Sequence, residues 1–149
     1  MKYTDNIELK CDYLVVGAGT GCLAFLDSLL THHTTATAIL IDRNAIPGGH
    51  WTTAYPFVRL HQPACFYGVN SMPLGTNRNA SGDEIFDLQD RSSSQEICSY
   101  YKKVVEKFEH TGRVQSFFST EYSKETDEST GSTKHVLKTP DGVYTVQCQ

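Results

Sequence analysis

The segment Gly17-Ala18-Gly19-Thr20-Gly21 has the residue types and spacing of a loop that binds phosphate. A side chain at its first or third position would keep a pyrophosphate away from the backbone, whereas glycine allows the close approach. Apolar residues recur at helical spacing directly after the loop. The amide groups and the positive dipole end of that helix would face the phosphates. The sequence therefore predicts a pyrophosphate site at this loop.

The loop departs from the usual G-x-G-x-x-G/A pattern at its sixth position, where Cys22 stands and a glycine comes one place early. The third small residue of the pattern lets the helix and the preceding strand pack closely, and cysteine is small enough to serve. A glycine pattern alone is weak evidence, so the alternative is a glycine-rich turn without a ligand.

Asp42 stands at the end of the next apolar stretch, roughly 20 residues after the glycine loop. A carboxylate at this place can accept hydrogen bonds from both hydroxyls of a ribose. The alternative is that Asp42 only terminates a strand. Because the carboxylate follows a glycine loop at this spacing, we favour ribose binding.

The candidate residues lie in a strand–helix–strand unit that spans residues 11–43. Residues 11–16 form an apolar run typical of a buried parallel strand, and residues 22–30 have helical spacing. The polar cluster 31–35 ends that helix, and residues 36–41 predict a second strand. We expect an α/β fold with a parallel sheet, a Rossmann-like domain whose nucleotide-binding core is this unit.

The region 44–93 is rich in proline and glycine, which disfavours regular helix or sheet. It also contains the aromatic residues Trp51, Tyr55, Phe57 and Tyr67, so disorder is the weaker alternative. We expect an ordered loop that packs on a ligand or on the rest of the domain.

The remaining part, 94–149, is expected to contain a helix followed by β-strands. Ser93 and Glu96 have the spacing of a capping box at the start of a helix that runs to about His110. Residues 113–122 predict a strand, with a polar tip after it.

A hairpin is the expected end of the chain. Residues 134–139 and 143–148 alternate as paired strands around the turn at 140–142. The whole chain, 1–149, is thus expected to be a single, partial domain.

The residues after the second strand resemble a known family. An acid–arginine pair, Asp42-Arg43, is followed by the turn Gly48-Gly49-His50-Trp51. This arrangement resembles the FAD-binding segment of flavin-dependent monooxygenases, which include the flavin-containing and Baeyer–Villiger types, and of related FAD/NAD(P)-binding oxidoreductases. In these proteins the acid–arginine pair ends the second strand and a G-G-x-W turn lies against the flavin.

The resemblance extends over residues 13–75. Tyr55-Pro56 and Arg59 are similar to the Baeyer–Villiger segment, which has an aspartate shortly after the arginine. This chain has His61 in roughly that place, so the role of the aspartate is not carried over. His61 remains a candidate residue near the cofactor, and the alternative is a loop histidine bonded to backbone.

The resemblance implies a role for each part of the motif. Asp42 would hold the adenosine ribose of FAD, and Arg43 would lie near the adenine. Gly49, His50 and Trp51 would approach the isoalloxazine side of the cofactor. The alternatives are a packed core aromatic for Trp51 and a loop histidine for His50. The residues that would face the pyrophosphate are those of the glycine loop: Gly17, Ala18, Gly19, Thr20 and Gly21.

These expectations favour the FAD-binding portion of an NAD(P)H-dependent flavoprotein oxidoreductase of the monooxygenase kind, with NADP as co-substrate of full-length relatives. No second glycine fingerprint follows Gly21. We therefore expect a fragment or degenerate paralogue that is inactive alone and that needs a second chain or a missing domain to complete its site. The alternative is a non-catalytic NAD(P)- or FAD-binding module that acts as a sensor or interaction protein.

Composition excludes other classes of function. The formal charge of −4 and the scattered Lys and Arg residues argue against a nucleic-acid surface. No apolar stretch reaches the roughly 20 residues of a spanning helix, and the N-terminus does not resemble a secretory signal. The five cysteines are widely spaced and indicate neither a disulfide framework nor a metal site, so we expect reduced thiols in the cytoplasm.

Overall fold

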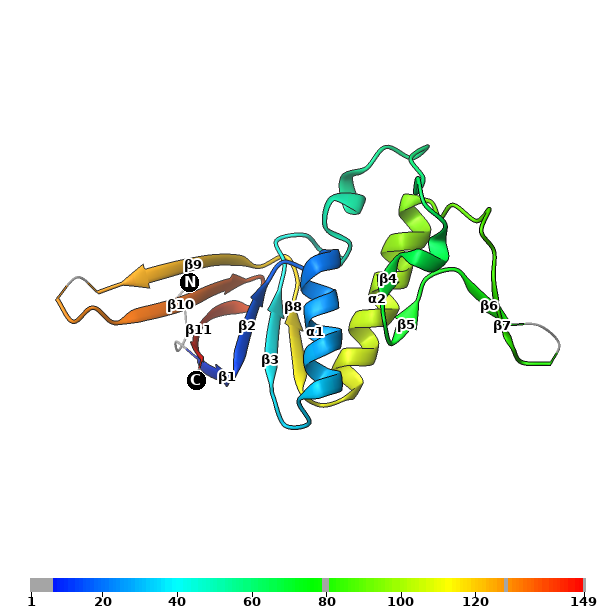
Figure 1. Ribbon diagram of the computed structural model, residues 1–149. Coiled ribbons are helices and arrows are strands. Elements are labelled where there is room, and N and C mark those ends of the chain that lie inside the picture. The colour runs from blue at the N-terminus through cyan, green and yellow to red at the C-terminus, as the bar shows by residue number, and fades with distance from the viewer. Residues whose placement is uncertain (1–6, 79–80, 128, 149) are drawn as a thin grey trace.

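A computed structural model of the chain describes residues 7–78, 81–127 and 129–148. These residues form a mixed α/β fold in layers (Figure 1). A parallel three-stranded sheet lies in the middle, with the helices α1 and α2 on one face and a four-stranded sheet on the other. The glycine loop lies at one end of the central sheet, so this sheet is what positions the candidate site.

The central sheet consists of β2 (Tyr13–Val16), β3 (Ala38–Ile41) and β8 (Val114–Phe117), in the order β2-β3-β8. All neighbouring pairs are parallel. Strand β3 is buried along its whole length because its side chains alternate between two cores. Ala38 and Leu40 pack toward the helices, whereas its two isoleucines pack toward the four-stranded sheet.

The helices α1 (Thr20–His32) and α2 (Ser94–His110) cover one face of the central sheet. The expected capping box of α2 is confirmed. The Ser93 hydroxyl accepts a hydrogen bond from the Glu96 backbone N–H at 3.3 Å, and the Glu96 carboxylate accepts one from the Ser93 N–H at 2.7 Å. Neither helix of the described residues is long and apolar enough to cross a membrane.

The four-stranded sheet has the order β1-β11-β10-β9. Its strands are β1 (Ile7–Cys11), β9 (Glu121–Thr126), β10 (Thr133–Thr139) and β11 (Gly142–Cys148). The expected hairpin of β10 and β11 is confirmed. Strand β1 pairs with β11 in parallel, so segments from the two ends of the chain lie side by side.

The expected bounds of two strands are wrong, because each predicted run is divided between the two sheets. The run 11–16 is divided between two sheets, because Asp12 leaves the ladder and accepts hydrogen bonds from the N–H and the hydroxyl of Thr37. The run 113–122 is also divided. Strand β8 ends at Phe117, Ser119 adopts a positive φ of 52°, and the chain then enters the four-stranded sheet.

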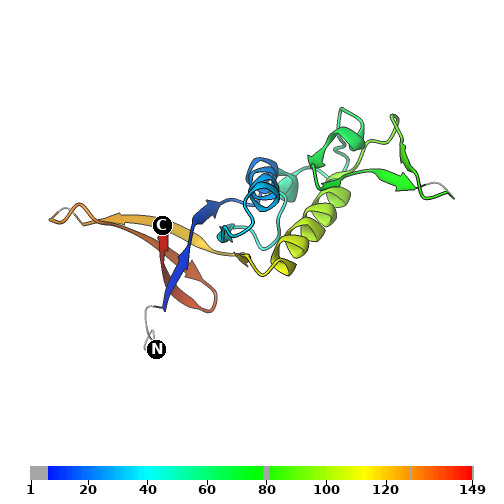
Figure 2. The same ribbon diagram turned by 60° about the horizontal axis from the view of Figure 1, so that its bottom comes forward.

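The expectation that region 44–93 has no regular structure is wrong in detail. It contains short helical turns and short strands, and the β6–β7 hairpin extends from one end of the molecule while the β9–β10 hairpin extends from the other (Figure 2). The elements are η1 (Gly49–Thr53), η2 (Ala64–Phe66), β4 (Gly68–Val69), β5 (Met72–Pro73), β6 (Thr76–Arg78) and β7 (Glu84–Phe86).

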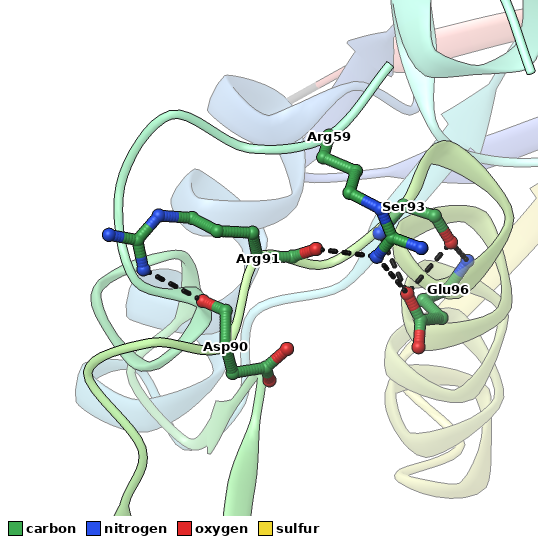
Figure 3. Close-up of polar contacts among 5 residues, drawn as sticks. All are labelled: Arg59, Asp90, Arg91, Ser93 and Glu96. Atoms are coloured by element: carbon green, nitrogen blue, oxygen red, sulfur yellow. Dashed lines mark hydrogen bonds and ion pairs between the residues drawn. The ribbon is translucent and has the colours of Figure 1, made fainter. Parts of the chain in front are cut away.

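Arg59 holds this region against the start of α2 (Figure 3). It pairs with Ser93 in an isolated antiparallel bridge, and its Nη1 donates to the Arg91 carbonyl at 2.9 Å. The guanidinium also lies 3.9 Å from the Glu96 carboxylate, but both side chains are largely exposed, so this ion pair contributes little stability. The contacts to the backbone are therefore the ones that fix the loop.

Candidate functional site

A cavity of about 750 Å³ opens at the carboxyl ends of β2 and β3. We call it the glycine-loop cavity. Its volume is in the range of sites that bind small molecules and cofactors, and the carboxyl ends of parallel strands are where open α/β sheets bind ligands. The residues that line it are Val16, Gly17, Gly19, Ile41, Asp42, Arg43, Asn44, Gly49, His50, Thr52, Thr53, Thr120, Glu121 and Tyr122.

The glycine loop turns sharply out of β2. Gly17 has a φ of +104°, which side chains other than glycine rarely adopt, and its N–H donates to the Ile41 carbonyl at 2.7 Å. Cys22 fills the space beneath it: a Cβ added to Gly17 would lie 3.8 Å from the Cys22 Sγ. The sixth position of the pattern is thus occupied by a residue small enough for α1 to pack against the strand.

A second turn packs directly on the loop. The Gly48 N–H donates to the Ala18 carbonyl at 2.9 Å, and Gly48 and Gly49 have φ values of +137° and +57°. A Cβ on Gly49 would come within 3.0 Å of the Gly19 Cα. The two glycine motifs therefore form one wall of the cavity, and a side chain at position 49 would strain the backbone and crowd their contact.

Asp42 joins the loop to the end of β3. Its side chain is 6% exposed, its Oδ2 accepts a hydrogen bond from the Ala18 N–H at 2.6 Å, and its Oδ1 accepts one from the Asn44 N–H at 2.7 Å. Each carboxylate oxygen has a further lone pair. Asp42 therefore fixes the loop and retains the capacity to accept hydrogen bonds from a ligand in the cavity.

The N-terminus of α1 is open to an anion. Its N-cap is Gly19, which offers no side-chain cap, and the first turn contains no acidic residue. At α2, by contrast, the Ser93–Glu96 capping box supplies both a cap and a negative charge. The first amide groups of a helix have no partner within the helix, so of the two described α-helices α1 has the end that is suited to a phosphate.

The curated proteins that are similar to this chain are themselves uncharacterized. No protein-family model matches the chain. It is 47% identical over 115 residues to the uncharacterized protein Rv2000 of Mycobacterium tuberculosis and, to the same degree, to the uncharacterized protein Mb2023 of Mycobacterium bovis. The matches cover 76% of this chain and 21% of each relative. The chain thus spans about a fifth of the length of these curated relatives.

Solved structures match over nearly the whole chain. A polycyclic ketone monooxygenase from Thermothelomyces thermophila has a TM-score of 0.65 at 14% identity, covering 99% of this chain and 23% of its own. An oxidized steroid monooxygenase bound to NADP has a TM-score of 0.59 at 19% identity, covering 93% and 25%. A cyclohexanone monooxygenase from Rhodococcus sp. Phi1 bound to NADP⁺ has a TM-score of 0.56 at 23% identity, covering 95% and 25%.

The chain has the fold of the Baeyer–Villiger flavin monooxygenases. The resemblance that the acid–arginine pair and the G-G-x-W turn indicate is therefore confirmed. Of the predicted site residues of this monooxygenase fold, six line the cavity. They are Gly17, Gly19, Asp42, Arg43, Gly49 and His50.

The other predicted residues do not line the cavity. Ala18 is fully buried and contributes its backbone to the contacts with Asp42 and Gly48. Gly21 follows on α1. His61 is exposed in the loop before η2, outside the cavity lining. The role of His61 near the cofactor therefore stays a prediction.

Trp51 and Thr20 belong to a chain of hydrogen bonds behind the loop. The Trp51 Nε1 donates to the Tyr67 hydroxyl at 2.7 Å, that hydroxyl lies 2.7 Å from the Thr20 Oγ1, and the Tyr101 hydroxyl donates to the same Oγ1 at 2.8 Å. Trp51 is 9% exposed, as expected if it is a packed core aromatic and not a residue that contacts the cofactor. Burial raises the pKa of Tyr101 far above its ordinary value, so the Tyr101 hydroxyl stays neutral.

Sequence reasoning missed the far wall of the cavity. Thr120, Glu121 and Tyr122 line it from the start of β9, and the Thr120 N–H donates to the Asp42 carbonyl at 2.9 Å. The Tyr122 ring stacks on His135 of β10. The signal was indirect: a third parallel strand beside β3 must also end near Asp42, so residues after that strand reach the same edge of the sheet.

Proposed function

We propose that the chain is the FAD-binding portion of an NAD(P)H-dependent flavoprotein oxidoreductase of the monooxygenase kind, built on a Rossmann-like nucleotide-binding core. The observation that carries the proposal is the glycine-loop cavity, in which the loop, Asp42 and the Gly48-Gly49 turn meet at the carboxyl ends of β2 and β3. The monooxygenase fold of the chain supports the flavin as the ligand.

The residues present fit FAD in their chemistry. The open N-terminus of α1 with the glycine loop would hold the pyrophosphate, since its amides have no side-chain cap. Asp42 would accept hydrogen bonds from the ribose hydroxyls with its remaining lone pairs. Arg43 would lie near the adenine. Gly49 and His50 would lie toward the isoalloxazine, since the turn packs on the loop.

The bound flavin would supply the electron transfer, with NAD(P)H as the reductant. The residues of this chain would bind and orient it. NADP as co-substrate of a larger protein is supported by structural neighbours that are bound to NADP and NADP⁺. His50 lines the cavity beside Gly49, so its imidazole would be available to donate or accept a hydrogen bond at that side.

Titration with FAD, NAD and NADP tests the proposal. FAD fluorescence should be quenched in a saturable manner, and ADP should compete for the site. Tighter binding of NAD than of FAD would replace the proposal by the alternative, a non-catalytic NAD-binding module. The absorption spectrum of the purified protein is the complementary observation, because bound oxidised flavin is yellow.

A further inference from the structure

Two cysteines from opposite ends of the chain lie beside each other at the edge of the four-stranded sheet. Cys11 ends β1 and Cys148 ends β11, and the two are direct partners in the parallel register of these strands. Their sulfur atoms lie 3.9 Å apart, although 137 positions separate the residues in the sequence. The pair lies before the start of β2, whereas the glycine-loop cavity lies at the other end of that strand.

The backbone geometry allows the two sulfurs to bond. Neighbouring strands of a sheet are roughly 4.8 Å apart, and disulfides join residues whose Cα atoms are roughly 4.4–6.8 Å apart. The sulfurs must approach from 3.9 Å to about 2.05 Å, which rotation of the two side chains can supply. All five cysteines are free thiols in the structure.

The two thiols have different environments. Cys11 is 4% exposed and packs in a core with Ile39, Leu137 and Val146, whereas Cys148 is exposed. Burial, with a further effect from the neighbouring Cys148, raises the pKa of the Cys11 thiol to about 12. Cys148 is therefore the thiol that meets a dissolved oxidant, and the strand register holds the Cys11 sulfur beside it.

We propose that Cys11 and Cys148 form a redox-sensitive pair that a peroxide converts into a disulfide between β1 and β11. In the first step the Cys148 thiol releases its proton, the thiolate attacks one oxygen of hydrogen peroxide and the O–O bond breaks. The sulfenic acid forms, and the departing hydroxide takes up the proton and leaves as water. In the second step the Cys11 sulfur attacks the Cys148 sulfur, the S–O bond breaks, and water leaves with the proton of the Cys11 thiol. Two thiols are oxidised and one peroxide is reduced to two waters.

The disulfide would add a covalent link between segments that the chain joins through strand pairing and core packing. Among the described residues of the four-stranded sheet, β1 forms its strand pairing with β11, and it leads directly into β2 and the glycine loop. A cross-link that closes a loop this long removes many conformations of the unfolded chain. Because Cys148 is exposed, a dissolved thiol can also reach and reduce the bond.

The experiment treats the reduced full chain with hydrogen peroxide, removes the oxidant and maps the peptides without reductant. We expect a monomer lighter by two hydrogen atoms, with the peptides of Cys11 and Cys148 linked. Its melting temperature should rise by roughly 5–15 °C and return to the starting value after dithiothreitol. The matched control is Cys65→Ser, which removes another incompletely buried thiol and should still form the bond.

The variants separate this pair from general oxidation. Cys148→Ser changes an exposed residue, so the protein should fold, yet peroxide should no longer produce the lighter monomer or the rise in melting temperature. Stable sulfenic or sulfinic acid at Cys148 without a link to Cys11 would overturn the proposal. So would a disulfide between two copies of the chain, or a lighter monomer whose linked peptides contain other cysteines.

Discussion

The backbones of Gly19 and Gly49 lie in contact, so that a Cβ on Gly49 would come within 3.0 Å of the Gly19 Cα. This contact joins the glycine loop to a turn that is distant in the sequence, and the hydrogen bond from the Gly48 N–H to the Ala18 carbonyl supports it. The shape of the glycine-loop cavity therefore depends on two glycine motifs together.

Gly49→Ala should destabilise the protein and weaken FAD binding. The φ of +57° costs an alanine roughly 1–2 kcal/mol, and the short contact with Gly19 adds to that. The matched control is Gly21→Ala, because a Cβ there meets nothing within 4 Å and its φ is not positive. Urea unfolding should show the control unchanged or more stable by up to about 1 kcal/mol. Equal stabilities of the two variants would contradict the close packing.

Gly19→Val should abolish FAD binding while the protein stays folded. The Cβ itself would lie 3.6 Å from the Gly49 Cα, an ordinary contact, but the branched methyl groups must enter the space of the pyrophosphate or press on the turn. Cys22→Gly is the comparison, and it should leave binding intact. Flavin fluorescence measures both. Wild-type affinity in Gly19→Val would show that the loop is not the phosphate site.

Asp42→Ala should lower the free energy of unfolding and weaken the binding of FAD and ADP alike. The buried N–H of Ala18 loses its acceptor, at about 1–3 kcal/mol, and the partly buried N–H of Asn44 loses its acceptor at a smaller cost. In the proposed complex the ribose hydroxyls lose their hydrogen-bond acceptor as well. The affinity for FAD and ADP should fall by roughly tenfold to a hundredfold. FMN lacks the adenosine and serves as the control ligand. If folded Asp42→Ala bound ADP as the wild type does, Asp42 would be a structural residue only.

The pH dependence of stability should contain a contribution from Glu96. Hydrogen bonds from the Ser93 N–H and then from its hydroxyl lower the pKa of this carboxyl, and Arg59 has a smaller effect. A lowered folded pKa contributes stability above the unfolded value of about 4.3, and this stability is lost as the pH falls through the folded value. Glu96→Gln keeps the capping hydrogen bond without the charge. The free energy of unfolding of this variant should fall less between pH 7 and pH 3 than that of the wild type. Parallel curves of unfolding free energy against pH would contradict the contribution of Glu96.

Features that depend on neighbouring residues were predictable from the sequence, and features that depend on pairing between distant strands were not. The Ser93–Glu96 cap and the sharp turn at Gly17 are local, so residue type and spacing suffice. Strand β1 alternates weakly and is stabilised by β11, which no local pattern reveals. The same holds for Thr120, which reaches the cavity only because β8 lies beside β3.

Trp51 shows a different limit of sequence reasoning. The G-G-x-W pattern places it near a cofactor, but the pattern does not say which way the ring points. The hydrogen bond from its indole to Tyr67 and its burial turn it away from the cavity lining. Large aromatic rings generally pack where their polar atom finds a partner, and here the partner is provided by a residue sixteen positions later.

Thr20→Val should destabilise the protein while changing FAD affinity little. The hydroxyl of Thr20 bonds the buried hydroxyls of Tyr67 and Tyr101, and valine has nearly the same shape without that oxygen. The Tyr101 hydroxyl loses the acceptor of its hydrogen bond, at about 1–3 kcal/mol, whereas the Tyr67 hydroxyl keeps the hydrogen bond from the Trp51 indole. A pyrophosphate at the helix end would be held by the backbone amide of residue 20, which the substitution retains.

The measurement is urea unfolding together with FAD titration under conditions where both proteins are folded. Tyr67→Phe is the matched control, since it breaks the same chain of hydrogen bonds behind the loop. A large loss of FAD affinity in Thr20→Val, with stability unchanged, would mean that the Thr20 hydroxyl turns toward the cofactor.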